Sequence, residues 1–145
     1  MISLINQLKD ELITLFSARE DYYGNTVIKK AYEALPKGHY PRVTIEEITN
    51  DSVTAREDSR GERTTRLSYQ ITCYSREMSE NNAVDSVMFM IKLIDDYLKT
   101  SQTFSAMSRI STTGARPYIV DDTVMMNTSR YTCVYDEETN LIYTN

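Results

Sequence analysis

The stretch Tyr40–Asn50, YPRVTIEEITN, has the alternating pattern of a half-buried β-strand. Val43 and Ile45 are apolar and point to one side, because successive side chains of a strand face opposite ways. The polar residues between and after them point to the other side. Ile48 interrupts the alternation, which predicts a bulge or a strand end at this position. The stretch therefore predicts a strand with one buried face and one polar face.

A second strand of the same kind is predicted at residues 66–76. Its apolar and polar residues alternate strictly, and those expected on the buried face are Leu67, Tyr69, Ile71 and Cys73. Between the two strands lie residues 54–65, TAREDSRGERTT, in which no aliphatic side chain is larger than that of alanine. This segment predicts an exposed loop or a hairpin tip.

Three segments have the spacing of amphipathic helices. Residues 2–19 place apolar side chains at intervals of three and four, and we expect Gly24 to stop this helix in a left-handed conformation. Residues 25–35 predict a short second helix. Residues 79–99 predict the clearest helix, whose buried stripe consists of Ala83, Val87, Met90, Ile91, Ile94 and Leu98.

The rest of the chain predicts further strands. Residues 103–112 alternate weakly, residues 128–136 alternate more clearly, and residues 141–143 predict a last short strand that closes as a hairpin. Strands joined by short links favour antiparallel pairing. The predicted fold is therefore α+β: one domain over residues 1–145, with a mostly antiparallel β-sheet of four to five strands and helices packed on one face.

The composition is that of an ordinary globular domain. Of the 145 residues, 41% are hydrophobic and 26% are charged, which disfavours disorder. The net charge of −5 disfavours a general nucleic-acid binder, because such proteins neutralise phosphates with basic side chains. No apolar run approaches the ~18 residues of a membrane span, and the first residues do not have the pattern of a secretory signal. We expect a cytosolic protein with reduced thiols.

The sequence contains no recognisable set of catalytic or metal-binding residues. His39 is the single histidine and lies in a predicted loop, where a solvated side chain is expected rather than a general base. Cys73 and Cys133 occupy inward positions of predicted strands, which favours core residues over zinc ligands. The paired acidic residues lack the spacing of a calcium loop, and no phosphate-binding glycine loop is present. We predict no catalytic residue, no cofactor and no metal site.

The loop between the first two strands suggests a contact surface. It carries both signs of charge, and every positive charge is an arginine, the basic residue best suited to specific interface pairs. Mixed charge fits contacts between copies of the chain, in which an arginine of one copy meets a carboxylate of the next. A solvated hairpin tip is the alternative. The candidate interface residues are Arg56, Glu57, Asp58, Arg60, Glu62, Arg63 and Arg66.

Three features together carry a family resemblance. They are the order helix, strand, long loop, strand, helix, strand, strand; the strand YPRVTIEEI followed by RLSYQITCYS; and the pattern NTSRYTCVYDEETNLIYTN. In these features, from about Leu4 to Tyr143, the chain resembles the small tail-terminator proteins of tailed bacteriophages and phage-tail-like particles, which are also called tail-completion or minor-capsid proteins.

The resemblance implies a structural virion protein without enzymatic activity. Such subunits form a hexameric ring on the last ring of the tail tube, stop its polymerisation and present a surface to the head or neck. The implied partners are further copies of the chain, the tail-tube protein, and sheath and neck or head-connector proteins, with no membrane. DNA would pass through the lumen without specific binding. The implied location is the virion tail, after assembly in the cytoplasm of the bacterial host.

Other functions stay open at this level. A head-completion or neck connector protein could share this outline, and a tail-tube subunit would be richer in β-structure. A small ligand-binding or enzymatic α+β domain would need a pocket with converging polar groups. A regulatory protein would act through the sheet edge. A measurement of native mass separates the ring from the monomer or dimer that the last two classes predict.

Overall fold

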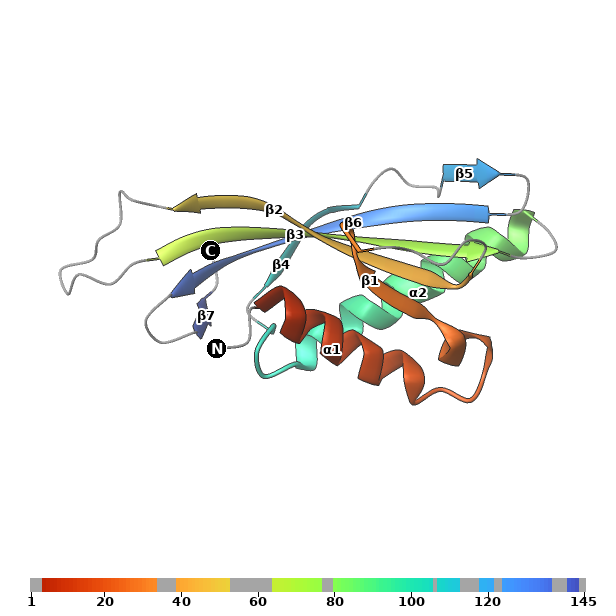
Figure 1. Ribbon diagram of the computed structural model, residues 1–145, viewed down its shortest axis with the longest axis horizontal. Helices are drawn as coiled ribbons and strands as arrows, with labels where there is room; N and C mark the ends of the chain where they lie inside the picture. Colours follow the sequence, from red (N-terminus) through yellow and green to blue (C-terminus); the bar gives the residue numbers. More distant parts are fainter. Residues whose placement is uncertain are drawn as a thin grey trace.

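The structure, a computed structural model, describes residues 4–33, 39–52, 64–76, 80–105, 107–112, 118–121, 124–136 and 141–143. Within these ranges the chain forms one seven-stranded sheet and two α-helices, and both helices lie on the same side of the sheet (Figure 1). The predicted α+β class, with helices packed on one face, is confirmed.

Helix α1 (Leu4–Ser17) packs on the sheet through a single apolar stripe. Residues four apart lie above one another on a helix, so a repeat of four gives one continuous face. The buried stripe consists of Leu4, Leu8, Leu12 and Phe16. The helix predicted for residues 2–19 is thus confirmed in its described part, and it ends at Ser17.

Helix α2 (Glu80–Thr100) contacts strands β3 and β6. Its described buried residues are those of the predicted stripe, Val87, Met90, Ile91, Ile94 and Leu98, together with Ser86. Ala83 belongs to the same predicted stripe, but its side chain lies outside the described part of the structure. Met88 and Phe89 are 40% and 37% exposed, so these two large apolar side chains lie beside the buried stripe and are not part of it.

The sheet has the strand order β1-β2-β3-β6-β4, and β5 and β7 also pair with β6. The strands are β1 (Val27–Lys30), β2 (Arg42–Ser52), β3 (Thr64–Arg76), β4 (Ser108–Thr112), β5 (Tyr118–Asp121), β6 (Val124–Asp136) and β7 (Leu141–Tyr143). Every pair is antiparallel except β1 with β2, which is parallel, so the sheet is mixed.

The prediction of four to five strands is wrong, because the described chain contains seven. The two strands that the sequence did not predict, β1 and β5, have four residues each. A run of four residues is too short for the alternating pattern to stand out from the helical one. Strand β6 also begins at Val124, before the predicted start at residue 128.

Strands β2 and β3 form a long antiparallel pair from Arg42 opposite Tyr74 to Ser52 opposite Thr65. The register shifts between Glu47 and Thr49, which confirms the bulge predicted from Ile48. The alternation is also confirmed, since the expected inward residues of both strands are buried. They are Val43, Ile45, Leu67, Tyr69, Ile71 and Cys73.

The helix predicted for residues 25–35 is wrong. The chain forms a short 3-10 helix at Tyr22–Asn25 and then strand β1, which pairs in parallel with residues 42–45 of β2. Ile28 is buried in the core cluster, and the β-branched pair Val27–Ile28 suits a strand. Pairing with a distant part of the chain therefore overrides the local helical spacing.

Gly24 does not stop helix α1 in a left-handed conformation, as the sequence suggested, but lies within the 3-10 helix. Its backbone passes so close to the residues that follow α1 that a Cβ atom would lie 2.2 Å from the carbonyl oxygen of Arg19. Glycine is needed here because the backbones approach closely, and the connection from α1 to β1 stays tight for the same reason.

The strand predicted for residues 103–112 is confirmed only in its second half. After α2 the chain turns, and the hydroxyl of Ser101 accepts a hydrogen bond from the backbone N–H of Phe104 at 3.2 Å. Phe104 is fully buried within this turn, and strand β4 begins at Ser108. Phe104 is a large apolar residue in a polar stretch, so its sequence context resembles that of a strand. In the structure its side chain instead packs the turn against the core.

The sheet face opposite the helices is polar and rich in threonine. Thr72 and Thr128 lie on neighbouring strands, and their hydroxyl oxygens are 2.9 Å apart. The Thr132 hydroxyl donates to the carbonyl oxygen of Leu67 at 3.2 Å. The hydroxyls are thus paired across the strands, and this face, which we call the open face, carries neither of the two described helices (Figure 1).

Candidate functional site

The residues predicted to form an interface divide between described and undescribed parts of the chain. Arg66 lies in β3, opposite Asp51 on β2 and Val134 on β6. The other six candidates lie outside the described residues; they are Arg56, Glu57, Asp58, Arg60, Glu62 and Arg63. The interface assigned to this loop stays a prediction.

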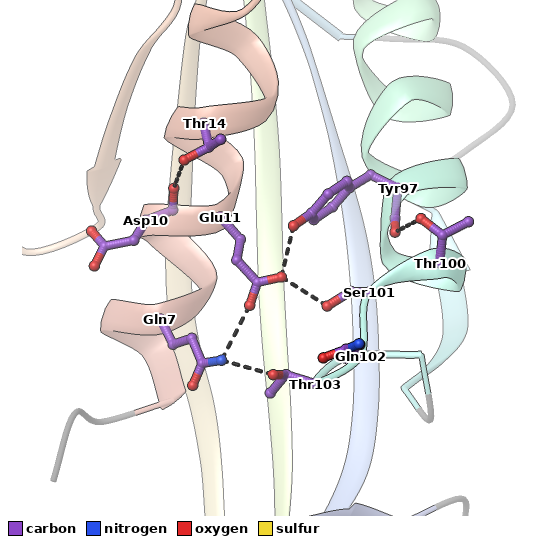
Figure 2. A pocket seen from close by; sticks show the side chains of 9 residues that line it. All are labelled: Gln7, Asp10, Glu11, Thr14, Tyr97, Thr100, Ser101, Gln102 and Thr103. Carbon is purple, nitrogen blue, oxygen red and sulfur yellow. Dashed lines mark hydrogen bonds between the residues drawn. The ribbon is translucent and has the colours of Figure 1, made fainter.

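The described residues form an open groove of about 530 Å³ between α1 and α2. Figure 2 shows its lining, in which polar side chains of α1 face those at the end of α2 and in the turn that follows. The central group is the carboxylate of Glu11. The lining residues are Gln7, Asp10, Glu11, Thr14, Tyr97, Thr100, Ser101, Gln102 and Thr103.

The Glu11 carboxylate joins the two helices through neutral donors. One of its oxygens accepts from the Tyr97 hydroxyl at 2.7 Å and from the Ser101 hydroxyl at 2.8 Å. The other accepts from the Gln7 amide at 3.3 Å, and that amide also donates to Thr103 at 2.7 Å. None of the ion pairs found within the described ranges involves Glu11. Among the described residues, the Glu11 carboxylate in this groove therefore has no cation as a partner.

Removal of the Tyr97 hydroxyl is expected to loosen the contact between the helices. Partial burial, and then the Glu11 carboxylate, raise the pKa of Tyr97 to about 12, so the hydroxyl stays protonated as a donor at neutral pH. Tyr97→Phe should lower the free energy of unfolding by about 1.5–3 kcal/mol, the range for a hydrogen bond to a charged group. Urea titration measures the change.

Tyr32→Phe is the matched control for this substitution. The Tyr32 side chain is 77% exposed, so loss of its hydroxyl should change the free energy of unfolding by less than about 0.5 kcal/mol. Equal effects of the two substitutions would show that the Tyr97–Glu11 hydrogen bond does not couple α1 to α2.

A second polar cluster lies at one end of strands β2 and β3. The guanidinium carbon of Arg42 is 4.4 Å from the centre of the Tyr74 ring and 4.9 Å from that of Tyr40. The guanidinium carbon of Arg76 is 4.8 Å from the Tyr40 ring centre. We call Tyr40, Arg42, Tyr74 and Arg76 the Arg–Tyr cluster. Arg42 and Tyr74 alternate with the buried Val43 and Cys73, so they lie on the open face.

Arg42 has an unusual environment within this cluster. Its side chain is half-buried, and its Nε atom is buried without a hydrogen-bond partner in the described part of the chain. Aromatic rings attract the positive charge but do not replace a hydrogen-bond acceptor in the guanidinium plane. A buried donor without an acceptor costs free energy.

The Arg–Tyr cluster was not predicted, although the sequence contains a signal for it. The motif Tyr-x-Arg occurs at Tyr40–Arg42 and again at Tyr74–Arg76. Alternate residues of a strand share a face, and the register places Arg42 opposite Tyr74. The two motifs therefore come together only when β2 and β3 pair antiparallel.

His39 lies at the surface of the described structure, and the two cysteines lie in its core. His39 is exposed, and its Nε2 atom lies 3.2 Å from the carbonyl oxygen of Asn25. Cys73 and Cys133 are free thiols in the core, as the sequence predicted. Burial raises the pKa of the Cys73 thiol to about 12, and burial followed by the charge of Glu47 does the same for Cys133.

The raised thiol pKa values predict a loss of stability in alkali. Above the ordinary pKa near 9 the unfolded chain loses thiol protons that the folded chain keeps until about pH 12. The contribution of the neutral thiols to the free energy of unfolding is therefore fully present below pH 9. It decreases as the pH rises, by up to about 1.4 kcal/mol per pH unit for each thiol. Urea titrations between pH 8 and 10 measure this slope.

A variant with Cys73→Ala and Cys133→Ala is the control for the alkaline slope. The variant will have lower stability at every pH because it loses buried side chains, so the slopes are compared rather than the absolute values. The slope of the variant should be shallower. Identical slopes would show that the thiols ionise equally in the folded and the unfolded chain.

The described residues contain neither a candidate metal site nor a helix that could cross a membrane. No group of three or more histidine, cysteine, aspartate or glutamate side chains in these ranges could hold a metal ion. Neither described helix combines the length and the apolar character that a membrane crossing requires.

No protein-family model matches the chain, and no curated protein matches it.

Proposed function

We propose that this chain is a tail-terminator subunit, a structural protein that caps the tail tube of a phage or phage-tail-like particle as a ring of copies. The sequence resemblance from about Leu4 to Tyr143 supports the proposal. The order of the predicted elements on which it rests agrees with α1, β2, β3, α2, β4 and β6 of the described chain. The proposed ring stops polymerisation of the tube and offers a surface to the head or neck.

The observation that carries the proposal is that the paired strands β2 and β3 extend beyond the helices. The two strands stay paired as far as Ser52 and Thr65, and at this end they extend beyond both helices (Figure 1). The connecting residues carry the mixed charges of the predicted interface loop. An arm that projects from the two-layer body can reach a neighbouring copy, and a closed ring needs such contacts between two different patches of one subunit.

Two further features fit this function. The open face of the sheet is polar and is covered by neither α1 nor α2, so it can face a neighbour or the lumen. The net charge of −5 suits a ring through which DNA passes without binding, because phosphates are attracted to basic rather than acidic surfaces.

The proposal is tested by the mass and shape of the native protein. Native mass spectrometry of the purified chain should give a species of six times 16.8 kDa, and negative-stain microscopy should show closed rings with a central opening. A stable ring interface should bury more than about 1,000 Å² in total, so the ring should persist at micromolar concentration. A protein that stays monomeric in both measurements contradicts the proposal.

A second experiment separates the terminator from the head-completion or neck connector alternative. The tagged chain is expressed together with the structural proteins of its own particle, and the complexes are purified through the tag. Co-purification with the tube protein supports a terminator. Co-purification with the portal alone supports a connector.

A further inference from the structure

The Arg–Tyr cluster and the groove between the helices are complementary in charge. The cluster offers a half-buried guanidinium cation held against the Tyr40 and Tyr74 rings. The groove offers a carboxylate whose partners among the described residues are all neutral donors, with Asp10 beside it. Neither feature is neutralised by the other within one copy, because the cluster lies on the open face and the groove lies in the helix layer.

We infer that Arg42 of one copy docks against the Glu11 groove of a second copy, and that this contact holds neighbouring subunits together. The inference rests on the proposed function, because it specifies the contact between copies that a ring requires. Two different patches meet, so the contact is heterologous, the type of interface that generates rings when its rotation closes.

The chemistry of the two patches favours a protein contact. Arginine and tyrosine are enriched among the residues that dominate the energy of protein interfaces, particularly where their side chains are held in place by neighbours. Arg42 is held by two rings before any partner arrives, so less side-chain entropy is lost on binding. Its planar donors match a carboxylate, which a guanidinium can bind through two parallel hydrogen bonds.

Nucleic acid is the alternative occupant of the cluster, because arginine and tyrosine also bind phosphates and stack on bases. The overall charge argues against it. The chain carries 21 acidic and 16 basic residues, whereas nucleic-acid binders usually have an excess of basic residues that neutralise phosphates.

The first part of the test measures self-association by sedimentation velocity over a range of concentrations. Arg42→Glu should weaken association at least ~10-fold, as expected for a central interface arginine. Arg130→Glu is the matched control, because Arg130 is an exposed arginine of the same open face whose guanidinium is 3.3 Å from the amide oxygen of Gln70. The control should change association less than about twofold. Equal effects of both variants would overturn the inference.

The second part asks whether Arg42 and Glu11 act through one contact. Glu11→Gln keeps the size of the side chain and an oxygen that can accept from Tyr97 and Ser101, but removes the charge. It should weaken association about as much as Arg42→Gln, and the double variant should be little weaker than either single variant. Additive losses would show that the two residues do not meet, and would overturn the inference. Thermal unfolding of each variant identifies any loss that is due to misfolding.

The third part measures binding of a fluorescent single-stranded oligonucleotide at low salt. No binding that depends on Arg42 is expected. Oligonucleotide binding that Arg42→Glu abolishes, while self-association is unchanged, would assign the cluster to nucleic acid and overturn the inference.

The outcomes for the contact and for the ring are distinguishable. If the unmodified chain forms rings and the variants form them equally well, only the inferred contact is wrong. If the unmodified chain stays monomeric at every concentration, the proposed function and the contact are both wrong.

Discussion

A chain that lacks residues 55–64 is expected to fold and to remain a monomer. Ser52 and Thr65 are partners in the β2–β3 register, so the deletion leaves Val53 and Thr54 as a two-residue connection between paired strands. Antiparallel strands can be joined by two residues, and the deletion removes only Thr64 from β3. The loop that is proposed to reach the next copy would be absent, and rings should disappear.

Light scattering and circular dichroism check this expectation together. A second deletion variant with Val53→Asn and Thr54→Gly provides the residues that a two-residue turn prefers, so it separates a poor turn from a missing interface. A third variant replaces residues 55–64 by glycine and serine at the same length, which restores the spacing but not the charges. Rings of normal size in the turn-optimised deletion would show that the loop makes no necessary contact.

Leu12→Ala is expected to cost about 3 kcal/mol of stability, because Leu12 is fully buried in the stripe by which α1 binds the sheet. Truncation leaves a cavity between the two layers that the sheet cannot fill without bending. For a domain of this size the melting temperature should fall by on the order of 10 °C. Thermal unfolding followed by circular dichroism measures the change.

Ile13→Ala is the control on the same helix. Ile13 is the next residue, has the same number of carbon atoms as leucine, and is 40% exposed. Its replacement should change stability by less than about 0.5 kcal/mol, since alanine is also the better helix former. Comparable losses for the two variants would contradict the orientation of α1 on the sheet.

The long elements could be predicted from the sequence because their burial is periodic. The stripe of α1 repeats every four residues, and the inward residues of β3 alternate without a break, so one face of each element must be covered. The bulge at Ile48 followed from a single break in that alternation. A pattern of this length contains enough residues that the structural preference of any single residue does not change the prediction.

The elements that could not be predicted depend on partners distant in the sequence. Strand β1 was assigned to a helix, because Val27, Ile28 and Ala31 also fit a helical face, and only pairing with β2 decides between the two. The Arg–Tyr cluster depends on the same kind of information, since its two Tyr-x-Arg motifs are brought together by the β2–β3 register. The Glu11 groove joins residues that are 86 and 90 positions apart.

The position of β6 within the sheet has a consequence for synthesis of the protein. β6 pairs with β3, β4, β5 and β7, yet it consists of residues 124–136 and is therefore among the last parts of the chain to be translated. Until the ribosome has passed residue 136, one edge of β3 has no strand to bind, and α2 has only part of the surface that it later covers. Nascent chains are therefore expected to fold late and to be vulnerable to aggregation and chaperone capture during translation.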